Sequence, residues 1–128
     1  MQNKKLIAYE GKEYTLEWYF DSKGKSKSFE YYQASTVDRK QKLARLLILL
    51  GDTGKIHNRE KFRHEEDQIY VFKPSLDRFF CFFYQGSKII TTNAYEKKTK
   101  KMPIREKTKA LMARIDYIQR CKDKTYYD

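Results

Sequence analysis

The side chains of this sequence that could carry out a reaction are mainly arginines, lysines and tyrosines, since 28 residues are lysine or arginine and 11 are tyrosine. Such side chains can cleave RNA without a metal ion. Lys or Arg can stabilise the charge that develops on a scissile phosphate, and Tyr or a Lys with a lowered pKa can move protons. The sequence has no legible catalytic triad, carboxylate pair, HxxxH motif or glycine-rich phosphate loop. Ordinary surface lysines would give the same composition, so both interpretations stay open at this point.

Cysteine and histidine, the usual ligands of transition metals, are sparse. Cys81 lies in an aromatic run, Cys121 lies near the end of a helical pattern, and no CxxC pair is present. His57 and His64 have no other histidine or cysteine near them at ligand spacing. The sequence therefore predicts no metal site, no redox motif and no cofactor.

Positive charge is in large excess. The 28 lysines and arginines stand against 17 aspartates and glutamates, which gives a net charge of +11 and a pI near 9.6. A compact domain with this excess attracts polyanions such as nucleic acid. Residues 97–109 concentrate the charge, with seven basic residues and one acidic residue, Glu106. Surface lysines can serve solubility alone, but the clustering favours a nucleic-acid footprint.

The length of 128 residues fits one domain, because compact domains run to about 100–150 residues. Neither a repeat nor a linker divides the chain, so we expect a single domain over residues 1–128. No run of about 18 apolar residues is present, and the first residues lack the apolar stretch of a signal peptide. We therefore expect a cytoplasmic protein with no membrane segment.

The first elements are predicted to be strands. Apolar and other residues alternate strictly over positions 13–20, with Leu16 and Trp18 on one side, which is typical of a half-buried strand. Residues 6–9 are expected to pair with this strand through a turn at Gly11.

Two helices are predicted next. A short helix ends near Ala34, and a second helix covers residues 36–50. Ser35 with Asp38 resembles a capping box at its start, and Gly51 is well placed to end it. The two helices should form a hairpin packed on a sheet. The apolar positions of the second helix are Val37, Leu43, Leu46, Leu47 and Leu50.

The second half is predicted to be rich in strands. Residues 68–73 form one strand, which Pro74 stops. Residues 78–84 form the next, and their unbroken run of Phe and Cys implies burial on both faces and hence a central strand. A hairpin turn at 85–87 leads to a third strand over 88–95.

A final helix should begin at Pro103, which suits a first helical turn. The element order is then strand, two helices, three strands and a helix, which indicates an α+β fold. The final helix carries an apolar stripe made of Ile104, Leu111, Met112, Ile115 and Ile118.

Several motifs in the second half follow one another in a set order. After Lys61-Phe62 they are IYVFK at 69–73, RFFCFF at 78–83, GSKII at 86–90 and NAYEKKTKKMP at 93–103. This series, over roughly residues 60–120, resembles the HigB toxins of the RelE superfamily, and more narrowly their phage-derived branch. That branch has an ELR strand, an Arg-led aromatic strand, a short turn and a closing GFxKKTxKTP segment before the last helix.

This sequence departs from the family pattern at three places. Lys73 stands where the strand arginine is usual, and Val71 stands where the glutamate is usual. The closing HGF is Asn93-Ala94-Tyr95 here, so the histidine that could act as an acid or base is absent. A lysine in place of an arginine keeps the charge but loses the bidentate fork.

The resemblance implies a RelE-like fold: a twisted, mainly antiparallel sheet packed against a helical hairpin, with a C-terminal helix. It also implies a toxin of a type II toxin–antitoxin system that acts as a metal-independent endoribonuclease, an mRNA interferase. Such a hydrolase cleaves mRNA on the ribosome and inhibits translation. The implied partners are therefore mRNA on the ribosome and a cognate helix-turn-helix antitoxin protein.

Residue roles carry over by position. The resemblance implies that Arg78 stabilises charge on the scissile phosphate, that Lys73 shares this task, and that Tyr95 transfers a proton or stacks on a base. Lys97 is assigned to the same catalytic set, although we expect it to bind a phosphate rather than to take part in the reaction itself. Each could instead be an ordinary residue of a strand or a solvated surface. The expected RNA-binding residues are Lys61, Arg63, Lys98, Lys100 and Lys101.

Two other functions compete with the nuclease. One is a non-catalytic inhibitor that binds nucleic acid or protein, such as a phage-derived inhibitor of the host. The other is a gyrase poison like the ParE relatives, which share the scaffold, because a fold alone does not determine function. The set of Arg78, Lys73 and Lys97 favours the nuclease.

Overall fold

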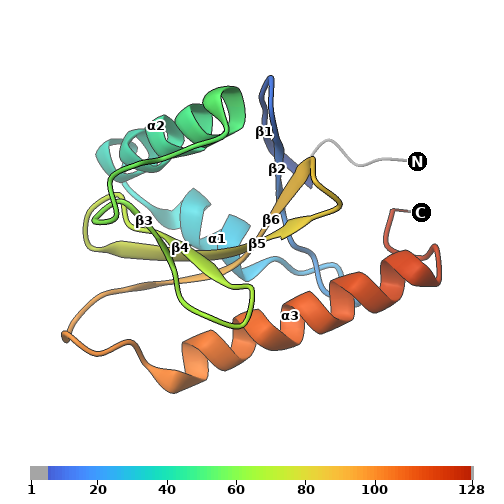
Figure 1. The fold of residues 1–128 in the computed structure, drawn as a ribbon. Helices are drawn as coiled ribbons and strands as arrows, with labels where there is room; N and C mark the ends of the chain where they lie inside the picture. The colour runs from blue at the N-terminus through green and yellow to red at the C-terminus, as the bar shows by residue number, and fades with distance from the viewer. Residues whose placement is uncertain (1–5, 128) are drawn as a thin grey trace.

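A computed structural model describes residues 6–127 of the chain. Six strands form one twisted sheet in the order β1-β2-β6-β5-β4-β3, and three helices pack on it (Figure 1). The elements in chain order are β1 (Ile7–Glu10), β2 (Thr15–Trp18), α1 (Lys27–Ala34), α2 (Val37–Thr53), β3 (Phe62–His64), β4 (Tyr70–Phe72), β5 (Asp77–Tyr84), β6 (Lys88–Glu96) and α3 (Ile104–Lys122).

The sheet is mainly antiparallel, as predicted. Among the strands of residues 6–127, only β2 and β6 run parallel, and every other pair of neighbouring strands is antiparallel. β5 and β6 form the central hairpin, whose turn places Gln85 and Gly86 at φ values of 50° and 72°. Two consecutive positive φ values are typical of tight hairpin turns that follow the twist of the strands. The α+β class and the RelE-like arrangement of the sheet are confirmed.

The helices cover both faces of the sheet. α1 and α2 pack on one face, through Leu43, Leu47 and Leu50 of α2, and α3 crosses the opposite face (Figure 1). Alternate residues of β5 serve the two sides: Phe79 and Cys81 face the helix pair, while Phe80 and Phe82 face α3. All four are buried, so the prediction of a central strand with two buried faces is confirmed.

β2 is the first element that differs from its prediction. The strand is shorter than expected, and both of its faces are buried rather than one, because β2 lies inside the sheet between β1 and β6. Glu17, which was expected on the wet side, has no exposed surface. It accepts a hydrogen bond from the Tyr127 hydroxyl at 2.8 Å, and the Lys88 ammonium lies 3.6 Å from its second carboxylate oxygen.

The ends of α2 also differ. Thr36 rather than Ser35 caps the helix, with its side chain accepting from the Arg39 amide at 3.3 Å. Ser35 instead closes α1, because its amide donates to the Tyr32 carbonyl. The helix ends at Gly54, whose φ of 80° is the left-handed conformation of a helix C-cap. Gly51 lies inside the helix and is buried against β1 and β2.

The close contact between Gly11 and Gly51 indicates that a larger residue at position 11 would destabilise the fold. A Cβ atom on Gly11 would lie 2.3 Å from the backbone carbonyl of Gly51, and this backbone sits within a helix. We expect Gly11→Ala to lower the free energy of unfolding by about 1–3 kcal/mol, the usual cost of overpacking. Urea denaturation of Gly11→Ala beside Lys12→Ala, an exposed neighbour, measures this cost. Equal midpoints for the two variants would contradict it.

β3 was not predicted as a strand, and β4 is shorter than expected. β3 pairs antiparallel with β4 at the edge of the sheet, with Phe62 opposite Phe72. The strand predicted over residues 68–73 is observed as Tyr70–Phe72. Gln68 belongs instead to a turn in which Glu66, Asp67 and Gln68 all have positive φ values.

α3 begins at Ile104, one residue after the predicted start, and Pro103 is its N-cap. Only part of the predicted apolar stripe contacts the core on this face of the sheet. The residues that α3 buries against the sheet are Glu106, Ala110, Ala113 and Tyr117. The small side chains of Ala110 and Ala113 let the helix approach the aromatic residues of β5 closely, and the Tyr117 ring packs edge-to-face against Phe82. Of the predicted stripe, Leu111 and Ile118 are half-buried and pack against this core, whereas Ile104, Met112 and Ile115 are exposed.

The remaining predictions concern cysteines and membrane segments. Cys81 is buried and Cys121 is half-buried, and both are free thiols. Residues 6–127 contain no helix with the length and apolarity needed to span a bilayer. They also hold no group of three or more His, Cys, Asp or Glu side chains placed to bind a metal ion.

Candidate active site

A cavity of about 280 Å³ opens at one end of the sheet, on the face that α3 covers. Four strands and the segment that joins β6 to α3, drawn in orange in Figure 1, contribute to it. All four residues that were predicted to be catalytic line this cavity. The lining residues are Arg63, Glu65, Val71, Lys73, Arg78, Tyr95, Lys97, Thr99, Lys100 and Met102.

The register of the sheet explains why these side chains meet. Arg63 of β3 lies opposite Val71 of β4, and Arg78 of β5 lies opposite Tyr95 of β6. Residues opposite each other in an antiparallel pair point to the same face of the sheet. Because Phe80 contacts the α3 side of the core, Arg78, two residues earlier, continues the same row beyond the cover of α3.

Arg78 is held by backbone carbonyls rather than by a carboxylate. Its Nη1 donates to the carbonyl oxygens of Ser75 at 2.7 Å and Asp77 at 2.9 Å. The Asp77 side chain is buried on the opposite face, where it accepts from the Tyr31 hydroxyl at 2.6 Å and lies 3.6 Å from Arg39. α1 and α2 thus fix the start of β5, and the guanidinium keeps its charge free for an anion.

Lys73 experiences the combined charge of its neighbours. Burial lowers the pKa of its ammonium, and the charges of Arg78 and Arg63 lower this pKa further, with a smaller effect of Lys97. The opposite charge of Glu65 acts in the other direction. A bound phosphate would relieve this repulsion, so the cavity favours an anionic ligand.

Tyr95 of β6 lines the cavity beside Arg78. Its ring stacks on Phe80 with centroids 5.9 Å apart. Burial raises the pKa of its hydroxyl above the usual value, although the Arg78 charge opposes this shift. The hydroxyl therefore stays protonated at neutral pH and can donate a proton or a hydrogen bond.

Glu65 is a lining residue that the sequence analysis missed. Among the residues that line the cavity, Glu65 is the acidic one, and its Oε2 lies 3.5 Å from Nε of Arg63. Its backbone amide donates to the Ile69 carbonyl at 2.8 Å, which holds it at the start of the turn that follows β3. A carboxylate among cations can accept a proton from a bound substrate.

Three predicted RNA-binding residues lie outside the cavity. Lys61 donates from Nζ to the Pro74 carbonyl at 3.2 Å. Lys98 lines a neighbouring hollow of about 460 Å³ together with Tyr31, Glu96 and Arg105. Lys101 is exposed and lines neither the cavity nor this hollow. Arg63 and Lys100, predicted with the same group, do line the cavity.

The fold and the cavity together define a class: a small α+β protein of RelE-like fold, with a cation-lined cavity on the face of the sheet that carries the last helix. The chain belongs to the family Phage derived protein Gp49-like (DUF891), whose model matches residues 31–114 and so includes every residue that lines the cavity. This is a family of RelE/HigB-like toxins, and membership implies a cognate antitoxin. No curated protein matches the chain.

Proposed function

We propose that this protein is the toxin of a type II toxin–antitoxin system and an endoribonuclease that cuts mRNA on the ribosome, in the manner of the phage-derived HigB branch. On this proposal residues 1–128 form one toxin domain that acts in the cytoplasm. The observation that carries it is the cavity itself. Lys73, Arg78, Tyr95 and Lys97 gather there around space for an anion, next to a carboxylate.

The reaction that fits these groups is attack of a ribose 2′-hydroxyl on the adjacent phosphate. The bond between O2′ and phosphorus forms, and the bond between phosphorus and O5′ breaks, leaving a 2′,3′-cyclic phosphate and a 5′-hydroxyl. Glu65 accepts the proton of the 2′-hydroxyl, and Tyr95 donates a proton to the departing O5′. Arg78 stabilises the negative charge that increases on the phosphate oxygens in the transition state.

The other cations bind the RNA backbone. Lys73 lines the same cavity as Arg78 and would share the scissile phosphate, although as a lysine it offers a point charge and no fork. Arg63, Lys97 and Lys100 also line the cavity and would contact neighbouring phosphates. Lys98 and Lys101 extend this track beyond the cavity.

We expect Tyr95→Phe to slow cleavage by about tenfold, less than a well-matched general acid contributes. The reason is that a phenol whose pKa is raised by burial is a weak acid at neutral pH. Single-turnover cleavage of mRNA on ribosomes measures the loss. The ratio of wild-type to variant rates should stay constant as the pH rises from neutral towards 10.0, because the hydroxyl loses its proton only above that value. A ratio that collapses near neutral pH would contradict the role as proton donor.

Replacing Lys97, Lys98, Lys100 and Lys101 together by alanine should weaken RNA binding and flatten its salt dependence. Each lost contact to a single-stranded phosphate is expected to reduce the slope of log K against log salt by about 0.7. Anisotropy of a labelled single-stranded RNA over a series of salt concentrations measures this slope. A control with Lys12, Lys23, Lys55 and Lys122 changed to alanine removes the same charge from exposed positions elsewhere. Equal slopes for the two variants would mean that residues 97–101 are a solvated surface.

The non-catalytic inhibitor and the gyrase poison make different predictions in cells. If the protein cleaves mRNA, its induction should create new mRNA 5′ ends within translated regions, and these ends should disappear when translation is blocked beforehand. Growth arrest without new 5′ ends would favour an inhibitor without nuclease activity. New ends that persist without translation would contradict the dependence on the ribosome.

A further inference from the structure

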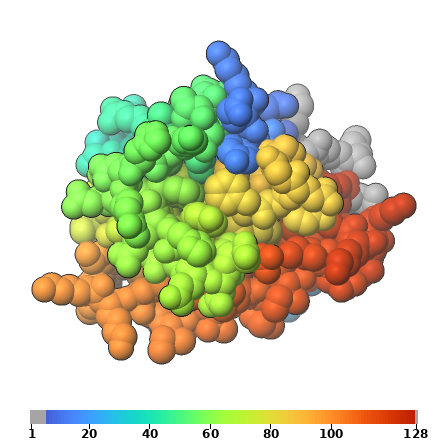
Figure 2. Space-filling model, in the orientation of Figure 1, coloured from blue at the N-terminus to red at the C-terminus, as the bar shows by residue number. Residues whose placement is uncertain are grey.

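The side of α3 that faces away from the sheet exposes an apolar surface, which we name the α3 outer stripe: Ile104, Met112 and Ile115. These side chains are 78%, 61% and 61% exposed. They recur at helical spacing on the side opposite Ala110, Ala113 and Tyr117, the residues that α3 buries against the sheet. In the space-filling view α3 forms the lower edge of the molecule, in orange and red (Figure 2).

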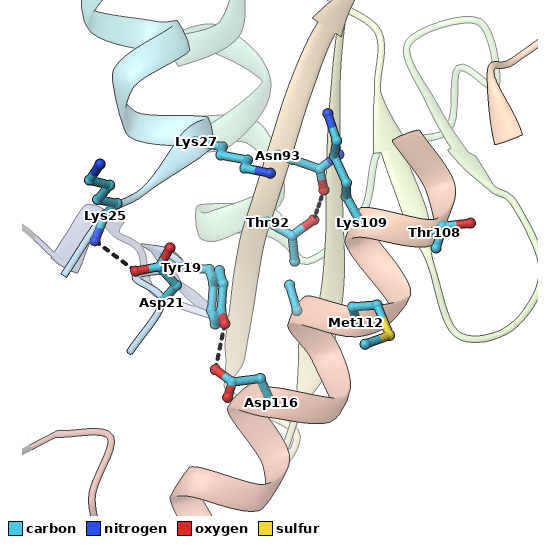
Figure 3. Close-up of a pocket in the computed structure, with 11 residues that line it drawn as sticks. Tyr19, Asp21, Lys25, Lys27, Thr92, Asn93, Thr108, Lys109, Met112 and Asp116 are labelled. Atoms are coloured by element: carbon cyan, nitrogen blue, oxygen red, sulfur yellow. Dashed lines mark hydrogen bonds between the residues drawn. The ribbon is translucent and has the colours of Figure 1, made fainter. Parts of the chain in front are cut away.

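A groove of about 380 Å³ runs beside this stripe, between α3 and the segment that joins β2 to α1. Figure 3 shows Met112 and Lys109 on the helix side of the groove, and Lys25 and Lys27 on the opposite side. The Tyr19 ring and Ala113 contribute to its apolar surface. The groove is large enough for one or two apolar side chains of a partner.

The charges around the groove are unbalanced. Its two acidic residues already have partners: Asp21 accepts from the backbone amides of Lys23 and Lys25 at 2.9 Å, and Asp116 pairs with Arg120 at 2.9 Å. The side chains of Lys25 and Lys27 form no ion pair within residues 6–127. The surface is therefore apolar with a cationic border.

We propose that the α3 outer stripe and its groove bind an acidic amphipathic helix of the antitoxin. The apolar face of that helix would cover Met112 and Ile115, and its carboxylates would pair with Lys25 and Lys27. The proposal rests on the proposed function only in naming the antitoxin as the source of the helix. RNA fits this surface less well than an acidic amphipathic helix does. Its phosphates would pair with the lysines, but the exposed isoleucines would stay in contact with water.

The position of the stripe also gives a route to inhibition. Ile104 lies two residues after Met102, which lines the candidate active site. A helix that covers the stripe from Ile115 to Ile104 extends over about 16 Å, at 1.5 Å per residue. Its end would reach the rim of the catalytic cavity, where it could obstruct the entry of mRNA.

The test uses two designed helical peptides of about 18 residues, about five turns each. Both carry leucine along one face, and their other positions are glutamate in one peptide and lysine in the other. We expect the full-length protein to bind the glutamate peptide about tenfold or more tightly than the lysine peptide. Met112→Glu with Ile115→Glu should weaken this binding by about tenfold or more, because it removes apolar contact and adds like charge.

A matched control changes Val37 and Ile48 to glutamate, since both are exposed apolar residues of α2. This control should bind the glutamate peptide like the wild type. Equal affinities of the control and the α3 variant, or a lysine peptide that binds as tightly, would overturn the proposal. So would an α3 variant that loses binding only to anionic phosphatidylglycerol vesicles or to RNA.

Two further measurements separate this proposal from the proposed function. The α3 variant should cleave mRNA on ribosomes at the wild-type rate. If the wild-type protein itself does not cleave mRNA, this result contradicts the proposed nuclease but leaves the docking surface untouched. In cells, the small gene next to that of the toxin should restore growth beside the wild type and the α2 control, but not beside the α3 variant. Restored growth with all three proteins, or with none, would overturn the assignment of the antitoxin.

Discussion

Arg78→Ala is expected to slow the cleavage of mRNA on the ribosome by about 10²–10³, the usual effect of losing one donor that stabilises charge in a transition state. The guanidinium is fixed by the carbonyls of Ser75 and Asp77, so its orientation is set before the substrate binds. A preorganised donor needs no rearrangement when the charge on the phosphate increases. Single-turnover rates with programmed ribosomes measure the effect on the chemical step.

Two controls show whether this loss is specific. Arg45→Ala removes the same charge from an exposed position of α2 on the other side of the sheet and should cleave at the wild-type rate. Arg78→Lys keeps the charge without the fork and should recover part of the activity. If Arg78→Ala cleaves as fast as Arg45→Ala, the catalytic role of Arg78 is wrong.

Glu65→Gln should lower the rate by about 10²–10⁴, the range of a general base in its transition state. The amide keeps the shape of the side chain and its oxygen can lie beside Arg63 as the carboxylate does, so the cavity should keep its form. What the variant loses is the ability to take the proton of the 2′-hydroxyl. Affinity for RNA should be unchanged or higher, because one negative charge is removed from the cavity.

Glu66→Gln is the matched control, because Glu66 is the exposed next residue and does not line the cavity. It should retain the wild-type rate. Two outcomes would count against Glu65 as the base: equal rates for the two variants, or a loss at Glu65 that comes entirely from weaker RNA binding.

The central part of the fold could be predicted because its signals are local. The aromatic run of β5 implies a strand buried on both faces, and the hairpin to β6 follows from the turn at Gln85 and Gly86. These two strands carry Arg78 and Tyr95 directly opposite each other. The resemblance supplied their roles, and the register accounts for their meeting in one cavity.

Glu65 could not be found in the same way. Its position depends on β3, a strand of three residues at the edge of the sheet with one buried residue, Phe62. Such a short segment has no period that a sequence pattern could detect. Once β3 is placed, Arg63 and Glu65 are two residues apart and can share a face, which explains their ion pair.

Glu17 and α3 show what the spacing of apolar residues in the sequence could not predict. The hydroxyl that donates to Oε1 of Glu17 belongs to Tyr127, which is 110 residues away in the chain. On α3 the sequence identifies an apolar stripe correctly but does not say which side of the helix meets the sheet. Ala110 and Ala113 meet it because they are small enough to pack on the aromatic residues of β5.

The most direct test of the proposed nuclease is the chemistry of the RNA ends. Purified protein is incubated with mRNA on translating ribosomes and, in parallel, with the same mRNA alone, and the 3′ and 5′ ends of the products are identified by mass spectrometry. We predict a 2′,3′-cyclic phosphate on the upstream fragment and a 5′-hydroxyl on the downstream fragment, with ribosomes only. Intact mRNA under both conditions, or fragments that end in a 3′-hydroxyl, would contradict the proposed reaction.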